Sequence, residues 1–206
     1  IAQDHKRIFD GDAGPNTGGM GAYTPVPQIP EEAVQQAISQ VLKPTAKGMV
    51  AEKRPFQGIL YAGLIQTATG PKVIEFNARF GDPETQVVLA RLESPLSEII
   101  SSLLVKEQPT IAWNELASVG VVVAAEGYPN QYKTNLPLPE MSGETIYYAG
   151  VTRSEQALVS AGGRIFLAEA TASTLEEARK KVYQTLDNYS FPGMYYRKDI
   201  GVKGLI

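Results

Sequence analysis

The sequence predicts an α+β fold, in which strands and helices form separate blocks instead of alternating. Two strand-like stretches at residues 58–66 and 72–77 are joined by a short turn, and signals for helix starts follow them. A polar segment at residues 106–115 then precedes a second block of short strands that ends in one helix. We therefore expect two domains, at residues 1–110 and 111–206, and the second should be a small α+β unit.

The composition argues against several classes of protein. Of the 206 residues, 43% are apolar, and no apolar run approaches the roughly 18 residues that a membrane-spanning helix needs. The net charge of -3 argues against nucleic acid or an acidic membrane as a partner, because such binding needs clustered Lys and Arg. The absence of Cys excludes disulfides and thiolate chemistry, and it fits a cytoplasmic protein. Because the chain starts without Met, we expect it to be a piece of a longer chain.

The N-terminal part of the chain should contain a loop followed by a helix. Residues 3–27 are rich in Gly, Asp, Asn and Pro without an apolar period, which predicts a long irregular loop. A helix is predicted from Pro30, because apolar residues then recur at spacings of three and four. We expect Pro44 to end or kink this helix.

Start signals for two more helices follow the predicted hairpin, whose turn we place at Thr69-Gly70. Asp82 is expected to cap the first of these helices, with Pro83 at its first position. Ser94 and Pro95 repeat the same signal for the second helix.

The last block combines short strands with one helix. Gly162-Gly163 is typical of the tight turn that joins two strands of a hairpin. The final helix should begin after Thr174, since Thr174 and Glu177 form a capping box ahead of an apolar stripe. The strands of this block are expected at residues 119–125, 145–150 and 164–168.

A row of polar residues occupies one face of the second predicted strand, in the string VIEFNARFGDPETQ. Because side chains alternate along a strand, Glu75, Asn77 and Arg79 share one face. The opposite face is expected to join the core, and it carries Ile74, Phe76 and Phe80. A carboxylate and an amide oxygen two residues apart could hold Mg²⁺ on a nucleotide, and a nearby guanidinium suits a phosphate. A solvated strand face with a surface ion pair is the competing interpretation.

A glycine-rich string, QDHKRIFDGDAGPNTGGMGAY, occupies residues 3–23. It is neither a Walker A loop nor a dinucleotide fingerprint, because no Gly-Lys-Ser/Thr follows and the glycine spacing differs. Its glycines can expose backbone N–H groups and let a ligand approach closely, although a turning surface loop has the same composition. His5, the only histidine, lies in a charged stretch, where a lone His is more often solvated than catalytic.

Several strings together resemble the glycinamide ribonucleotide synthetase family of the ATP-grasp superfamily. They are QDHKR, GPNTGGMGAY, YAGL, VIEFNARFGDPETQ, EGYP and YRKDIG, which occur in family order and at family spacing over nearly the whole chain. The resemblance implies the C-terminal part of an ATP-grasp domain, with an antiparallel sheet and helices, followed by a small α+β domain. It also implies that an N-terminal portion of the same enzyme, with most of the adenine site and the lid, precedes this chain.

The resemblance also implies roles for particular residues. Glu75 and Asn77 would hold Mg²⁺ or Mn²⁺ on the ATP phosphates, although the preceding strand lacks the extra carboxylate ligand of many ATP-grasp enzymes. Arg79 would stabilise the transferred phosphate, and Asp82 would border the acceptor site. The remaining residues implied to contact substrate are Asp4, Lys6, Asn16, Thr17, Gly18, Gly19 and Gly21.

The reaction that the resemblance implies is an ATP-dependent carbon-nitrogen ligation of purine synthesis. The glycine carboxylate would attack the γ-phosphate of ATP, and the amine of 5-phosphoribosylamine would then attack glycyl phosphate. Because the lid is implied to lie outside this chain, we do not expect the chain to catalyse the reaction alone. Two alternatives stay open: another ATP-grasp carboxylate-amine ligase, and a non-catalytic domain that keeps a ligase-like shape.

Overall fold

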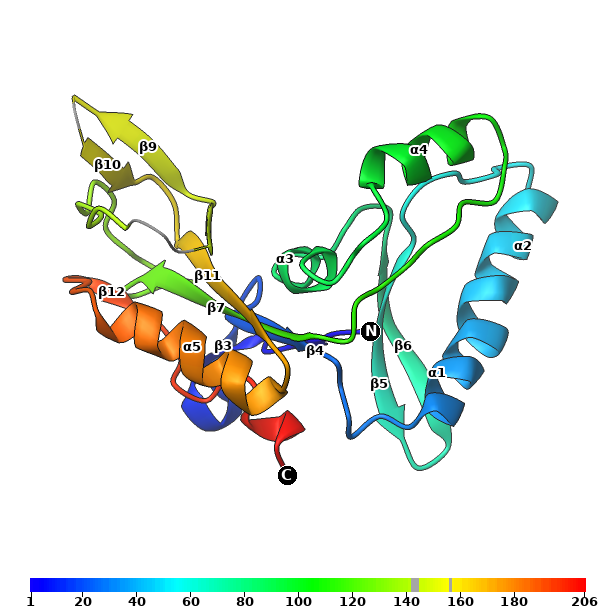
Figure 1. Ribbon diagram of the computed structural model, residues 1–206, viewed down its shortest axis with the longest axis horizontal. Coiled ribbons are helices and arrows are strands. Elements are labelled where there is room, and N and C mark those ends of the chain that lie inside the picture. Colours follow the sequence, from blue (N-terminus) through cyan, green and yellow to red (C-terminus); the bar gives the residue numbers. More distant parts are fainter. Residues whose placement is uncertain (142–144, 156) are drawn as a thin grey trace. The chain divides into compact units, whose positions relative to one another are not determined.

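The computed structural model describes residues 1–141, 145–155 and 157–206. The chain forms two compact units. The first unit comprises Ile1–Val26, Asp82–Arg91 and Asn114–Ile206, and the second comprises Pro27–Gly81 and Leu92–Trp113. Both units combine antiparallel strands with helices, so the predicted α+β class is confirmed (Figure 1). No helix among the described residues has the length and apolar character that a bilayer crossing requires.

A six-stranded sheet forms the frame of the first unit, with the order β1-β4-β7-β11-β8 and with β12 also paired to β7. The central strand β7 is buried along its whole length, since its run of Val and Ala is covered by neighbouring elements. The strands are β1 (Gln3–Asp4), β4 (Gly21–Thr24), β7 (Ala117–Ala125), β8 (Thr145–Tyr148), β11 (Arg164–Ala172) and β12 (Met194–Tyr195).

Helix α5 (Leu175–Asp187) lies along β7 and β11 (Figure 1). The Thr174 side chain accepts a hydrogen bond from the Glu177 backbone N–H, so the predicted helix start is confirmed. The short helix α3 (Glu84–Leu89) packs against β4 and β7 of the same sheet. The predicted final block of strands and helix is therefore present, with β11 longer than expected.

Two small hairpins complete the first unit. Strands β2 (Arg7–Phe9) and β3 (Ala13–Asn16) pair on either side of the 3-10 turn Asp10–Asp12. Strands β9 (Val151–Ser154) and β10 (Ala157–Ser160) form the second hairpin, which no sequence signal predicts. Gly162-Gly163 does not close a hairpin, because β10 pairs with β9 while β11 pairs with β7 and β8.

The prediction of an irregular loop at residues 3–27 is wrong. This segment contains β1 to β4, and Met20, Ala22 and Tyr23 are fully buried. Gly21 pairs with Val121 of β7, and a Cβ there would lie 2.5 Å from the carbonyl oxygen of Gly120. Strand β4 is hidden in the sequence because its partner, β7, lies far along the chain, and the strands of this segment are only two to four residues long.

The second unit contains the predicted hairpin and three helical segments. Strands β5 (Tyr61–Thr67) and β6 (Gly70–Asn77) pair in antiparallel register, as predicted. The helical segments are α1 (Glu31–Ala37), which continues through a π-helical turn (Ile38–Leu42) into α2 (Lys43–Ala51), and α4 (Leu96–Leu104). Pro44 does not end the helix. The π turn lies directly before it, and there the Lys43 N–H donates to the Ile38 carbonyl, so the helical path continues into α2.

Two sequence expectations at this hairpin and beyond it are wrong. The opposite face of β6 is not core, because Ile74 is 67% exposed and Phe76 is 41% exposed. Phe80, just beyond the strand, is also exposed. Asp82 does not cap a helix, since α3 begins at Glu84 without a side-chain cap, and the Asp82 carboxylate binds Arg164 instead.

Candidate functional site

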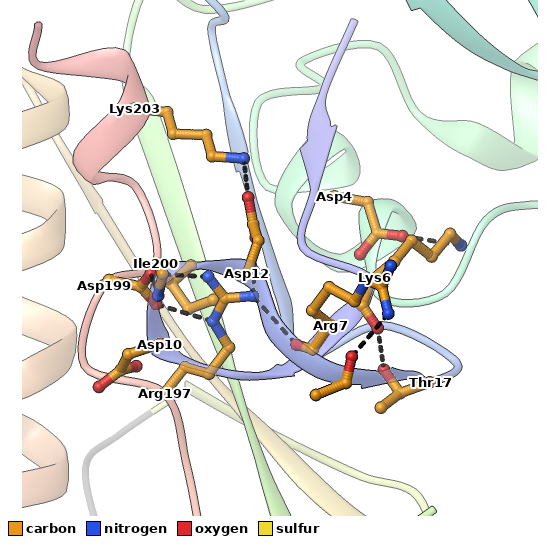
Figure 2. A network of polar contacts seen from close by, with 12 residues as sticks. Asp4, Lys6, Arg7, Asp10, Asp12, Thr17, Arg197, Asp199, Ile200 and Lys203 are labelled. Carbon is orange, nitrogen blue, oxygen red and sulfur yellow. Dashed lines mark hydrogen bonds and ion pairs between the residues drawn. The ribbon is translucent and has the colours of Figure 1, made fainter.

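The candidate site of the first unit begins at Asp4, at the end of β1. Asp4 pairs with Ala22 of β4, and its Oδ2 lies 2.7 Å from Nζ of Lys6 (Figure 2). Burial raises the pKa of the Asp4 carboxyl to about 6, and the hydrogen bond from Lys6 only partly opposes this. The two residues are therefore a partly buried ion pair at a strand end.

The turn Thr17 to Gly19 lies close to Asp4. The Thr17 hydroxyl donates to the carbonyl of Lys6 at 2.8 Å and accepts from the Gly19 N–H at 2.9 Å, so it closes the turn (Figure 2). Gly19 has φ of +115°, and a Cβ there would clash with the ring of Pro83 and lie 2.8 Å from Oδ1 of Asp4. Glycine is thus required at this position by both the backbone conformation and the close approach.

Arg164, at the start of β11, joins this turn to Asp82. Its Nη1 donates to the carbonyls of Gly18 and Asp82, each at 2.9 Å. Its Nη2 donates to Oδ2 of Asp82 at 2.6 Å. The sequence does not mark Arg164, because the Gly-Gly-Arg step is typical of a turn and a single Arg at a strand start carries no periodic signal.

A second polar network ties the C-terminal segment to the turn Asp10–Asp12 (Figure 2). Arg197 is fully buried, and its Nε and Nη2 each donate to the Asp199 carboxylate at 2.7 Å. Its Nη1 donates to the carbonyl of Arg7 and to Oδ1 of Asp12. Burial would raise the pKa of Asp199, but the hydrogen bonds from Arg197 hold it well below its usual range. This network holds in place the segment that leads into the glycine-rich turn.

His5 is buried, so the expectation that it is solvated is wrong. Burial, assisted by the positive charge of Arg197, lowers the pKa of His5 to about 4. Neither ring nitrogen has a hydrogen-bond partner among the described residues.

Asn16 and Gly21 are placed apart from the turn. Asn16 is exposed at the end of β3 and lies opposite Arg7. Gly21 is buried in β4. The sheet contact described above accounts for glycine at position 21. The structure therefore brings together Asp4, Lys6, Thr17, Gly18, Gly19 and Asp82 among the residues selected from the sequence.

The other candidate residues lie on the hairpin of the second unit. Glu75 is opposite Gly63 of β5, where a Cβ would lie 3.1 Å from Cγ of Glu75, so the glycine leaves room for the carboxylate side chain. Asn77 is opposite Tyr61 two residues further on, and a bulge falls before Glu75 in the register. Arg79 follows the strand, and its Nη1 donates to the carbonyl of Phe80 at 2.8 Å.

The donor set of this hairpin fits a hard cation that takes most of its ligands from elsewhere. Within residues 1–141, 145–155 and 157–206, no group of three His, Cys, Asp or Glu side chains could hold a metal ion. One carboxylate and one amide oxygen suit Mg²⁺ or Mn²⁺ when phosphate and water complete the shell.

Family models match two parts of the chain. The model described as "Phosphoribosylglycinamide synthetase, ATP-grasp (A) domain" matches residues 1–85, and the one described as "Phosphoribosylglycinamide synthetase, C domain" matches residues 118–203. Curated relatives named phosphoribosylamine--glycine ligase agree. That of Halalkalibacterium halodurans is 54% identical over 99% of this chain and 49% of its own length. That of Lactococcus lactis is 53% identical over 100% of this chain and 50% of its own length. The chain thus spans about half the length of these relatives.

Solved structures show the same likeness. The phosphoribosylamine--glycine ligase of Thermotoga maritima superposes with a TM-score of 0.89 at 34% identity, covering 97% of this chain and 50% of that one. The biotin carboxylase domain of the Hydrogenobacter thermophilus 2-oxoglutarate carboxylase, in a complex with MgADP, has a TM-score of 0.61 at 16% identity, covering 86% of this chain and 40% of that one. The second likeness concerns the fold alone.

Proposed function

Because this chain belongs to the phosphoribosylglycinamide synthetase family, we propose that it is part of an enzyme that joins glycine to 5-phosphoribosylamine with ATP. The products are glycinamide ribonucleotide, ADP and phosphate. The observation that carries the proposal is the 54% identity to a phosphoribosylamine--glycine ligase over 99% of the chain. The chain would act in the cytoplasm, as part of a longer polypeptide that supplies the remaining ATP site.

On this proposal, residues of the hairpin β5–β6 serve the phosphate end of ATP. Glu75 and Asn77 hold the divalent cation, which when bound neutralises phosphate charge. Their shared strand face and the space left by Gly63 support this role. Arg79 stabilises the transferred phosphoryl group, since a guanidinium binds phosphate oxygens in a bidentate way.

The turn and ion pairs of the first unit serve the substrates on this proposal. The backbone of Thr17, Gly18 and Gly19 borders the path by which a substrate enters. The close packing of Gly19 on Asp4 supports a fixed conformation of this turn. Asp82 borders the acceptor site, with its carboxylate oriented by Arg164. Alignment of glycyl phosphate with the attacking amine is the main contribution of such a site, together with exclusion of water.

The division of labour follows the proposed domains. Residues 1–110 would form the C-terminal part of an ATP-grasp catalytic domain, and residues 111–206 would form a small C-terminal domain. Ile1–Val26 and Asp82–Arg91 of the first of these domains share a compact unit with Asn114–Ile206. The matches of the two family models, at residues 1–85 and 118–203, support a boundary between residues 85 and 118.

The test is an assay of ADP formation by the full-length protein with a panel of carboxylic acids and amines. We expect ADP formation beyond one equivalent per enzyme to require both glycine and 5-phosphoribosylamine, because glycyl phosphate is protected from water until the amine arrives. Equal or faster turnover with a different acid and amine would identify another ATP-grasp ligase. A protein that binds neither nucleotide nor divalent cation would be a non-catalytic domain of this family.

A further inference from the structure

Arg164 is placed to control the geometry of the candidate acceptor site. A single guanidinium contacts two segments that lie far apart in the sequence, the turn at Gly18 and the residue Asp82. The plane of the guanidinium also packs closely on Gly18, since a Cβ at that position would lie 3.0 Å from Cζ of Arg164. The guanidinium therefore links the turn directly to Asp82, beside the close packing of Gly19 on the ring of Pro83.

Tyr128 binds the same turn, at the N–H of Gly18. Its hydroxyl oxygen accepts a hydrogen bond from the Gly18 N–H at 3.0 Å. Its ring packs directly on Gly163, where any side chain would clash with it. Both the N–H and the carbonyl of Gly18 are thus bound by side chains that meet at the start of β11.

The contacts of Arg164 fix the orientation of the groups that it binds more than they stabilise the fold through charge. The Asp82 side chain is 48% exposed and that of Arg164 is 21% exposed, so the ion pair by itself adds little to stability. The hydrogen bonds to two backbone carbonyls and a carboxylate, by contrast, require the flat, forked guanidinium. A lysine would keep the charge and lose most of the geometry.

We propose that Arg164 is a positioning residue of the ligation reaction, which holds the Gly18 carbonyl and the Asp82 carboxylate at the separation that the amine substrate requires, and that the Tyr128 hydroxyl assists it. The proposal rests on the proposed function, because it assigns Arg164 to the amine site of that reaction. Arg164 itself touches no reacting atom on this proposal.

The test compares Arg164→Lys and Arg164→Gln with the parent in the full-length protein. We expect kcat/KM for 5-phosphoribosylamine to fall roughly 100-fold in both variants, as a small misplacement of reacting groups costs about that much. The KM for ATP and the thermal midpoint should stay close to the parental values. Arg153→Gln is the control, because Arg153 is an exposed residue of β9, and it should keep the parental kinetics.

A second measurement does not depend on the reaction. Amide hydrogen exchange across residues 17–20 should accelerate in the Arg164 variants and, at the Gly18 amide, in Tyr128→Phe, which keeps the ring against Gly163. Parental kinetics together with parental exchange in Arg164→Lys and Arg164→Gln would overturn the proposal. If those variants do not fold, parental exchange and turnover in Tyr128→Phe would overturn it. A parent that lacks glycine-dependent activity but shows the exchange effect would refute the proposed function and retain the tether at Gly18.

Discussion

The buried network around Arg197 predicts a large and specific loss of stability in Arg197→Met. Methionine fills much of the same space but leaves Asp199, Asp12 and the Arg7 carbonyl without their shared donor. Removing one partner of a buried pair typically costs about 3–5 kcal/mol. Water can reach the abandoned carboxylates, because Asp199 is 27% exposed and Asp12 is 37% exposed, so we expect the lower end, about 3 kcal/mol.

Denaturant unfolding at pH 7, followed by circular dichroism, measures this loss. Lys203→Ala is the matched control, since Lys203 binds the same Asp12 carboxylate from an exposed position and should cost no more than about 1 kcal/mol. The effect of Arg197→Met should also shrink below pH 3.8, the ordinary pKa of Asp199. The depressed pKa of Asp199 gives its full stabilisation above that value, and this contribution is lost progressively as the pH falls from 3.8 toward the lower pKa of the folded state. A cost of Arg197→Met no greater than that of Lys203→Ala would refute the reasoning.

Three further predictions test separate parts of the structure. Glu75→Ala and Asn77→Ala should each remove most turnover of the full-length protein without shifting its thermal midpoint, and parental turnover in both would show that the metal assignment is wrong. Asp4→Asn should make the unfolding free energy rise more steeply with pH between about 4 and 6, by up to about 1.4 kcal/mol per pH unit. The raised pKa of Asp4 makes folding less favourable as pH rises, whereas the lowered pKa of the buried His5 makes folding more favourable, so the two contributions offset each other in the parent. An unchanged pH dependence of the unfolding free energy in chemical denaturation would contradict the prediction for Asp4→Asn. Gly19→Ala should destabilise by about 2 kcal/mol or more because of its positive φ and the adjacent proline ring, whereas Gly48→Ala, in an open helical position, should not destabilise when both are compared by denaturation.

Local sequence patterns predict those elements whose formation depends on residues within the element itself. The hairpin β5–β6 is visible from two strand-like runs around a short turn, and helix α5 from its capping residues and apolar stripe. The Val-rich run at residues 119–125 predicts β7, because a buried central strand needs no polar alternation.

Long-range pairing could not be predicted in the same way. The strands β1 to β4 are two to four residues long and contain two glycines, and β4 pairs with β7 far along the chain. Alternation likewise identifies the two faces of β6 but does not say which is covered, and Ile74 is exposed.

Polar tethers were the least predictable part of the candidate site. Arg164 binds Asp82, which lies more than 80 residues before it in the sequence. Arg197 binds Asp12, which lies more than 180 residues before it. No local spacing marks such contacts. The resemblance instead implies roles for Asp4, Thr17, Gly19 and Asp82. Arg164 binds Asp82, Thr17 accepts from the Gly19 N–H, and Gly19 lies against Asp4.

The proposed activation of the glycine carboxylate as an acyl phosphate is tested most directly with glycine labelled by oxygen-18 in its carboxylate. The full-length protein would be given labelled glycine, ATP and 5-phosphoribosylamine, and the released inorganic phosphate would be analysed by mass spectrometry. We expect one labelled oxygen in each phosphate, because the oxygen that attacks the γ-phosphate stays with phosphorus when the amine takes the acyl group. Unlabelled phosphate formed together with product would contradict the account.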